Sequence, residues 1–282
     1  MLIYHADVFS KEPYSGNGLT VVIYDHELDR EKMQNIACEF KQFETIFLKK
    51  IKPDVFEAKI FTVEEELKFA GHPIIGGAAI VHKEFFVGDK EKEITFKLQE
   101  KDVITSSKAM HNYYEVTMNQ GAPQWITKVQ EEWQAKYCAS LNLYLEDLSN
   151  DYPMEVVSTG LPYLLVPIKS GLERTKISSI NFEAQLAKNN AKFVYVFDIN
   201  KMEGRTWDNM GLIEDIATGS AAGPMGAYLY KHNYCSKNKV ISINQGQYVG
   251  KHCLLKVSCT EETDEIFVSG EVVVLMKGEL FV

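Results

Sequence analysis

The chain has 282 residues, of which 45% are hydrophobic and 24% charged, and its formal net charge is −9. This composition is typical of a folded globular protein, and the length favours two domains of about 100 to 150 residues over one core. Because no stripe of Lys and Arg offsets the negative charge, nucleic acid and anionic membrane surfaces are excluded as expected partners.

The N-terminal segment "MLIYHADVFSKEPYSGN" has neither a basic start nor an apolar stretch long enough for export. No segment approaches the roughly 18 apolar residues that a membrane span requires. The five cysteines are odd in number and include no C-x-x-C pair, so neither a disulfide framework nor a zinc site is indicated. We therefore expect a cytoplasmic protein with reduced thiols and no metal.

Two strands and a helix are predicted at the start of the chain. Residues 2–10 and 19–24 are apolar runs, separated by the turn-rich "KEPYSGNG" at 11–18. Apolar side chains then recur at helical spacing within 29–41, with Asp29 as the predicted N-cap.

One carboxylate, Glu44, lies in the apolar, strand-like run "FETIFL" at 43–48. Burying an ionised carboxylate is costly unless another group pairs with it. One interpretation is that strand alternation points Glu44 to solvent while its neighbours face a core. The other is that Glu44 belongs to a functional site, and this pattern leaves both open.

Short alternating runs fill most of the remaining chain, and a helix is predicted within 128–143. The strand candidates of the first half lie within 54–69, 92–100, 102–108 and 113–123; those of the second half lie within 154–168, 192–200, 239–247, 252–259 and 265–280.

Two segments rich in Gly and Ala interrupt this pattern, at 69–83 and 216–231. Gly71 aligns with Gly219 and Lys83 with Lys231, both at an offset of 148 residues. A repeat at this period predicts two copies of a strand-rich unit, each with one helix whose small residues let a sheet wrap closely around it. The alternative is that two small-residue helices align by chance.

The starts of these two helices carry polar residues. Pro73 suits the first helical position, which would place His72 at the cap, and Ser220 is the equivalent cap in the second helix, preceded by Asp215 and Thr218. A helix start offers free N–H groups and a positive dipole end, so each could bind a carboxylate or phosphate. Two such starts related by a pseudo-twofold axis would hold a small anionic metabolite, whereas ordinary capping is the alternative.

Several blocks occur in the order expected of the phenazine biosynthesis PhzF-like family, which the chain resembles over nearly its whole length. They are "DVFSKEPYSGN", "FETIFL", "FTVEEELKFAGHPIIGGAAI", "STGLPYLLVP", "EDIATGSAAG" and "INQGQYVG". The resemblance implies an α+β, diaminopimelate epimerase-like fold of two pseudo-symmetric domains. Each would be a curled, barrel-like β-sheet around a central α-helix, with the active site in the cleft between them. We expect the domains at 1–118 and 119–270, with a strand at about 271–282 returning to the first.

The resemblance also implies catalytic roles. The glutamate in the block matching "FETIFL" moves a proton from carbon in the characterised isomerases of the family, which maps onto Glu44 as general base and acid. The blocks "AGHP" and "EDIATGS" carry over His72 and Asp215 as groups that position substrate or relay the proton. No cofactor is then required.

Substrate binding is implied at Gly71, Gly219 and Ser220, and Asn17 of "SGN" is a further cleft candidate. Related racemases use two cysteines, one at each helix start, but His72 and Ser220 occupy those positions here. The chain also departs from the family pattern in having Gly rather than Pro after Asn17 and Ile rather than Pro after Asp215. These changes keep the proposed base but leave the substrate open.

The sequence therefore predicts a cofactor-independent isomerase that moves a proton between carbons of a small carboxylate-bearing metabolite. A racemase or epimerase without the two-cysteine mechanism is the first alternative, and a non-catalytic small-molecule-binding protein is the second. Family members often form homodimers, so a homodimer is one expected assembly.

Overall fold

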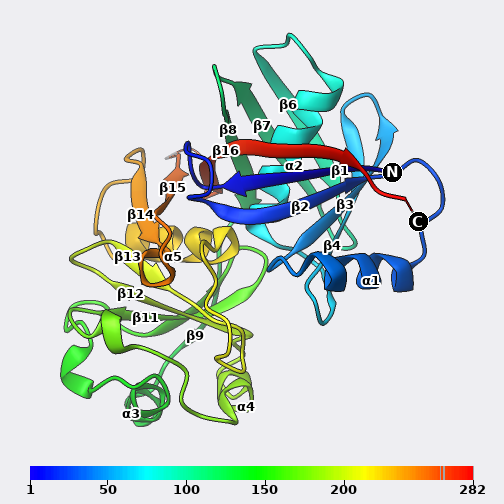
Figure 1. The fold of residues 1–282 in the computed structure, drawn as a ribbon. Helices are drawn as coiled ribbons and strands as arrows, with labels where there is room; N and C mark the ends of the chain where they lie inside the picture. The colour runs from blue at the N-terminus through cyan, green and yellow to red at the C-terminus, as the bar shows by residue number, and fades with distance from the viewer. Residues whose placement is uncertain (261, 263, 282) are drawn as a thin grey trace. The chain divides into compact units, whose positions relative to one another are not determined.

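The computed structural model describes residues 1–260, 262 and 264–281 and forms two units (Figure 1). Unit 1 consists of Met1–Asn119, His252–Leu254 and Val268–Val282, and unit 2 consists of Gln120–Lys251 and Leu255–Phe267. Within the part of the chain that is described, no helix is both long and apolar enough to cross a membrane.

Unit 1 is a closed barrel. Its strand order is β1-β2-β3-β4-β6-β7-β8-β16, and β16 also pairs with β1, which closes the ring. The short strand β5 pairs with β4. The bounds are β1 Leu2–Val8, β2 Asn17–Ile23, β3 Thr45–Lys52, β4 Val55–Phe61, β5 Glu66–Leu67, β6 Glu91–Lys97, β7 Asp102–Ala109, β8 Tyr114–Gly121 and β16 Ile266–Glu279.

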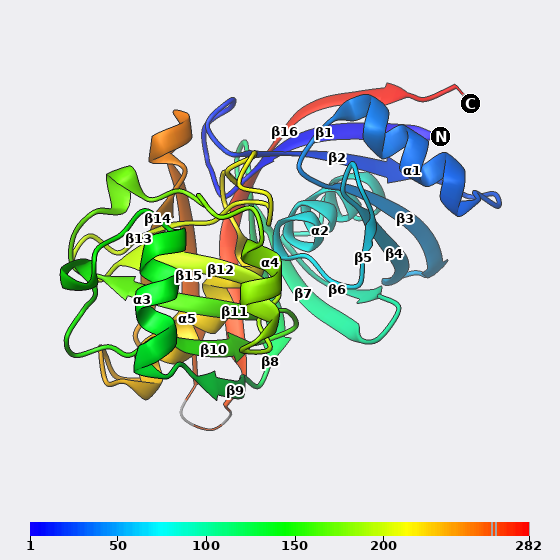
Figure 2. The ribbon, with the colours of Figure 1, turned by 90° about the horizontal axis from the view of Figure 1, so that it is seen from below.

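Helix α2, Gly71–Phe85, lies inside this barrel (Figure 2). Every residue of α2 from Gly71 to His82 is buried, as expected of a helix enclosed on all sides. Its small residues permit this enclosure, because a Cβ built on Gly76 would lie 2.3 Å from Leu19 Cδ2 of strand β2. The Gly/Ala-rich helix predicted from the sequence is thus confirmed.

Helix α1, Arg30–Phe40, packs on the outside of unit 1. Asp29 is its N-cap, as predicted, and accepts a hydrogen bond of 2.7 Å from the Lys32 N–H. Successive side chains of β3 point to opposite faces of the sheet, so this strand contacts both α1 outside the barrel and α2 inside it. Phe47 joins Met33 in the outer core cluster beneath α1, whereas Ile46 packs near Gly77 of α2.

Unit 2 is a sheet in the order β15-β14-β13-β12-β11-β10-β9. The buried helix α5, Gly219–Lys231, contacts β10 and β11, and a Cβ built on Gly226 would lie 2.3 Å from Val257 Cγ1 of β15. The bounds are β9 Gln124–Lys128, β10 Glu155–Ser158, β11 Pro162–Ile168, β12 Phe193–Asp198, β13 Glu203–Arg205, β14 Ile241–Gln245 and β15 Cys253–Cys259.

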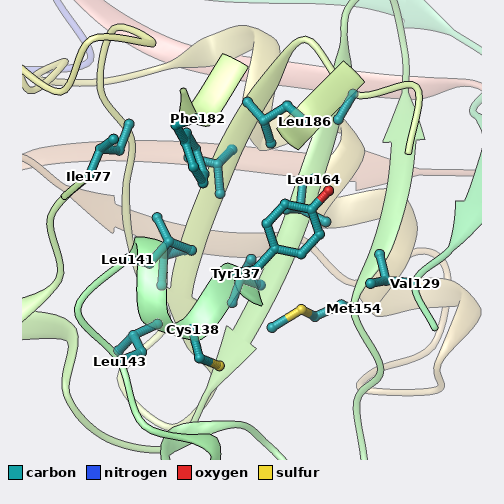
Figure 3. Close-up of a cluster of buried hydrophobic side chains, with 14 of the residues drawn as sticks. Val129, Tyr137, Cys138, Leu141, Leu143, Met154, Leu164, Ile177, Phe182 and Leu186 are labelled. Carbon is teal, nitrogen blue, oxygen red and sulfur yellow. The ribbon is translucent and has the colours of Figure 1, made fainter. Parts of the chain in front are cut away.

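A second helical layer covers the other face of this sheet. Helices α3, Glu131–Ser140, and α4, Phe182–Ala187, carry Tyr137 and Phe182 into one apolar cluster with Leu164 of β11 (Figure 3). Strand alternation separates the two faces, because Tyr163, next to Leu164, bonds instead to Ser220 of α5. The predicted helix within 128–143 is confirmed, whereas α4, a helix of only six residues, was not predicted from the sequence.

The α+β class with barrel-like sheets around central helices is therefore confirmed. Three 3₁₀ turns complete the described elements: η1 Leu145–Asp147, η2 Leu172–Arg174 and η3 Gln247–Val249.

Candidate active site

Glu44 lies directly before strand β3 and is only 7% exposed. It continues the inward-facing series of Ile46 and Leu48, which pack near Gly77 of α2. Its Oε2 atom lies 2.8 Å from Nδ1 of His72. The solvent-facing interpretation of Glu44 is therefore wrong, and His72 supplies the partner that a buried carboxylate requires.

His72 is the second residue of α2 and is 2% exposed. The helix begins at Gly71 with Ala70 as the cap, so the predictions of His72 as the cap and Pro73 as the first helical residue are wrong. Proline fits the third position because N–H groups throughout the first turn have no acceptor within the helix. Ala70 makes no side-chain cap hydrogen bond, so no side chain closes this helix start by capping.

Asn17, the first residue of β2, is the third member of what we call the Glu44 cluster: Asn17, Glu44 and His72. Its Nδ2 atom lies 3.5 Å from His72 Nδ1, at the outer limit of a hydrogen bond. A Cβ on the preceding Gly16 would lie 2.7 Å from the Val8 carbonyl oxygen, which requires glycine at this turn. The structure thus brings together three predicted residues that are far apart in the sequence.

The Glu44 cluster can hold and move one proton. An imidazole and a carboxylate whose nitrogen and oxygen atoms lie 2.8 Å apart form an ion pair when the imidazole is protonated, and both groups can give and accept a proton. The cluster therefore contains the acid and base functions that proton transfer at carbon requires.

The Asp215 cluster is formed in unit 2 by Asp215, Thr218 and Gln245. Asp215 precedes α5, is 2% exposed, and accepts a hydrogen bond from the Thr218 hydroxyl. Thr218 is the residue before α5 and makes no side-chain cap hydrogen bond to it. The prediction of Ser220 as the cap is wrong, because Ser220 is the second helical residue, one position after Gly219.

Ser220 is also buried, and its hydroxyl lies 2.8 Å from the hydroxyl of Tyr163. Within unit 2 the second position of the helix therefore carries a neutral hydroxyl, whereas the Asp215 carboxylate lies before the helix and accepts from Thr218. The dipole of the helix is positive at this end.

Three residues near α5 were missed from the sequence: Tyr163, Tyr195 and Gln245. Burial raises the pKa of Tyr195 far above its ordinary value, and the Asp215 carboxylate adds to that effect. Tyr163 and Gln245 lie in the blocks "STGLPYLLVP" and "INQGQYVG", which carry the family resemblance and could have indicated these two residues. Among the described residues, no group of three or more His, Cys, Asp or Glu side chains could hold a metal ion.

Comparisons with known proteins match this chain over nearly its whole length. The family described as "Phenazine biosynthesis-like protein" matches residues 6–278. The uncharacterized isomerase YddE of Salmonella typhimurium is 29% identical over 98% of this chain and 97% of its own length. Trans-2,3-dihydro-3-hydroxyanthranilate isomerase of Pseudomonas chlororaphis is 27% identical over 97% of each chain. The solved structure of a predicted epimerase from Pseudomonas aeruginosa is 38% identical, with a TM-score of 0.95 over 100% of this chain and 99% of that one.

Proposed function

The chain belongs to the phenazine biosynthesis-like protein family, and from that premise we propose a cofactor-independent isomerase that moves a proton between carbons of a small carboxylate-bearing metabolite. The observation that carries this proposal is the buried ion pair between Glu44 and His72, 2.8 Å apart. Relatives named as isomerases support the reaction class.

In the proposed reaction Glu44 acts first as a base. Its carboxylate takes a proton from a carbon of the substrate, and the electron pair of the broken C–H bond enters the adjoining unsaturated or carboxylate group. The proton then returns to another carbon, from Glu44 or through His72, as a new C–H bond forms. A positioned acid–base group of this kind contributes about 10²- to 10⁴-fold to the rate.

The substrate class follows from the helix starts. The first-turn N–H groups of α2 in unit 1, and those of α5 in unit 2, are suited to stabilising negative charge. Gly71, Gly219 and Ser220 would supply such groups, and Asn17 would supply an amide. We further propose that Asp215 orients the substrate or relays the proton, which is why a substrate with both a carboxylate and a polar substituent is expected.

An epimerase is the second candidate, favoured by the likeness to the solved structure of a predicted epimerase. In that reaction the proton returns to the carbon from which it left, but on the opposite face. Inversion of one stereocentre without movement of a double bond would identify this outcome.

The test is deuterium incorporation from heavy water, followed by mass spectrometry. The panel consists of small unsaturated and amino carboxylic acids and includes trans-2,3-dihydro-3-hydroxyanthranilate, the compound that the Pseudomonas chlororaphis relative is named for. We expect one compound to exchange with the native enzyme and about 10³-fold more slowly with Glu44→Gln. Glu93→Gln, a change of the same type at an exposed position of β6, is the matched control and should exchange normally.

Two results would contradict the proposal. Undiminished exchange in Glu44→Gln would place the base elsewhere. Binding of panel compounds with no exchange in either protein would favour the non-catalytic binding protein.

A further inference from the structure

Gln245, the last residue of β14, makes four hydrogen bonds around the segment that leads into α5. It is 1% exposed. Its Nε2 donates to the Asp215 carbonyl oxygen and to Thr218 Oγ1, both at 2.9 Å. Its Oε1 accepts from the Thr218 N–H at 3.2 Å and from the Tyr195 hydroxyl at 3.0 Å. Both donors and both acceptor sites of the amide are used.

The orientation of this amide is fixed by two backbone groups. The Asp215 carbonyl can only accept a hydrogen bond, and the Thr218 N–H can only donate one. Turning the Gln245 side chain over would set its NH₂ group against the Thr218 N–H and its oxygen against the Asp215 carbonyl. Nε2 must therefore face Thr218 Oγ1 as a donor.

This orientation determines where the Thr218 hydroxyl proton points. Thr218 Oγ1 already receives a hydrogen from Gln245, and it has one hydrogen of its own. That hydrogen is donated to the Asp215 carboxylate. The result is a directed chain from Gln245 through Thr218 to Asp215, and a hydroxyl that donates to a carboxylate stabilises its ionised form.

We propose that Gln245 is a positioning residue that acts through Thr218 to hold Asp215 ionised and oriented. Its effect on turnover rests on the proposed function, since it requires that Asp215 takes part in the reaction. The hydrogen-bond chain itself does not depend on that role and can be measured without a substrate.

Other ionisable groups lie on the surrounding elements of unit 2. They are Tyr195 of β12, Tyr163 of β11, Glu203 and Arg205 of β13, and Glu214. Arg205 and Glu214 form their own ion pair at 2.6 Å. All of these groups are present in every variant below, so differences among the variants report on Gln245 and Thr218.

The experiment follows the titration of Asp215 by carbon NMR in protein labelled at aspartate carboxyl groups, with Asp215→Asn to assign its signal. Thr218→Val removes the donating hydroxyl at nearly constant shape, and Gln245→Glu removes an amide donor. Each should make Asp215 about a tenfold weaker acid, the effect of one lost hydrogen bond to a charged group. Thr218→Ser keeps a hydroxyl at this position, so Asp215 should titrate in this variant as it does in the native protein.

Gln247→Glu is the matched control for added charge, because Gln247 is exposed and only two residues away. If the Asp215 titration is unchanged in either Thr218→Val or Gln245→Glu, or moves equally in Gln247→Glu, the inference is overturned. If Gln245→Glu does not fold, the comparison of Thr218→Val with Thr218→Ser still tests whether the Thr218 hydroxyl acts on the Asp215 titration.

Deuterium exchange then separates this inference from the proposed function. We expect the acid limb of the rate–pH profile to move to higher pH in Thr218→Val and Gln245→Glu, whereas a packing role would lower the rate without moving that limb. A titration that moves while no compound exchanges in any protein would support the hydrogen-bond chain and contradict the isomerase proposal.

Discussion

The starts of helices α2 and α5 share one design but differ in their chemistry. Each begins with a glycine, carries a buried polar residue at its second position, and has no side-chain cap hydrogen bond. In α2 that residue is His72, ion-paired to Glu44; in α5 it is Ser220, which bonds to the neutral Tyr163 hydroxyl. The two helix starts therefore share their glycine and their lack of a side-chain cap, whereas of the two only the start of α2 carries a titratable pair at its second position.

Helix α1 shows what an ordinary start looks like in the same chain. There the Asp29 side chain accepts from the Lys32 N–H, whereas the equivalent N–H of α5, that of Ala221, donates to the Thr218 carbonyl oxygen. A capped start of this kind stabilises a helix, whereas the starts of α2 and α5 are buried and have no side-chain cap hydrogen bond.

The largest expected effect tests the chemical difference between the two starts. His72→Asn keeps a polar side chain but removes the titratable partner of Glu44, so we expect deuterium exchange to fall by about 100-fold. Ser220→Ala removes only a neutral hydroxyl, and a loss of less than about tenfold is expected for one neutral hydrogen bond. Both rates are measured with the same compound.

Equal losses in the two variants would break this comparison, because the two starts would then contribute alike. A pH profile adds a second criterion. The profile should change shape in His72→Asn and keep its shape in Ser220→Ala, since an imidazole can change its charge with pH and a serine hydroxyl cannot.

The next effect concerns the glycines that let a sheet pack closely against α2 and against α5. A Cβ on Gly76 would lie 2.3 Å from Leu19 Cδ2, so Gly76→Ala forces a shift in the barrel core and should destabilise unit 1 by about 1–3 kcal/mol. Gly77→Ala is the matched control, because its Cβ would lie 3.4 Å from Ile46 Cδ1 and alanine favours a helix by about 1 kcal/mol. Gly226→Ala should destabilise α5 as Gly76→Ala destabilises α2, since its Cβ would lie 2.3 Å from Val257.

The probe for these variants must distinguish the units. Trp125, Trp133 and Trp207 all lie in unit 2, so tryptophan fluorescence during urea unfolding reports on Gly226→Ala. Amide hydrogen exchange of α2 reports on Gly76→Ala and Gly77→Ala. Equal stability of Gly76→Ala and Gly77→Ala would contradict the tight packing of α2 within the barrel.

Local signals predicted the fold better than the site. Helical spacing and a capping residue were enough to place α1 with Asp29, and small residues were enough to predict α2 and α5. The Glu44–His72 pair could be expected only from the family resemblance, because its two residues lie on different elements and meet only when the barrel closes. Gln245 was missed for the same reason, since its partners Tyr195 and Asp215 come from distant parts of the chain.

Helix boundaries show a further limit of local signals. Proline at the first helical position is a common pattern, but Pro73 occupies the third position of α2, where it is also tolerated. That difference moves His72 from the cap into the first turn, where its ring meets Glu44.

The smallest expected effect is at the capped start of α1. Asp29→Ala removes the bond to the Lys32 N–H and should destabilise unit 1 by about 1 kcal/mol, the usual value of an N-cap. Asp25→Ala, at an exposed position just before the helix, is the matched control. Stability is read from amide exchange of α1, and turnover from deuterium incorporation, which should stay at the native rate because α1 packs on the outside of unit 1. If Asp29→Ala slowed incorporation as much as His72→Asn, the distinction between a capped structural start and an uncapped start for ligand binding would fail.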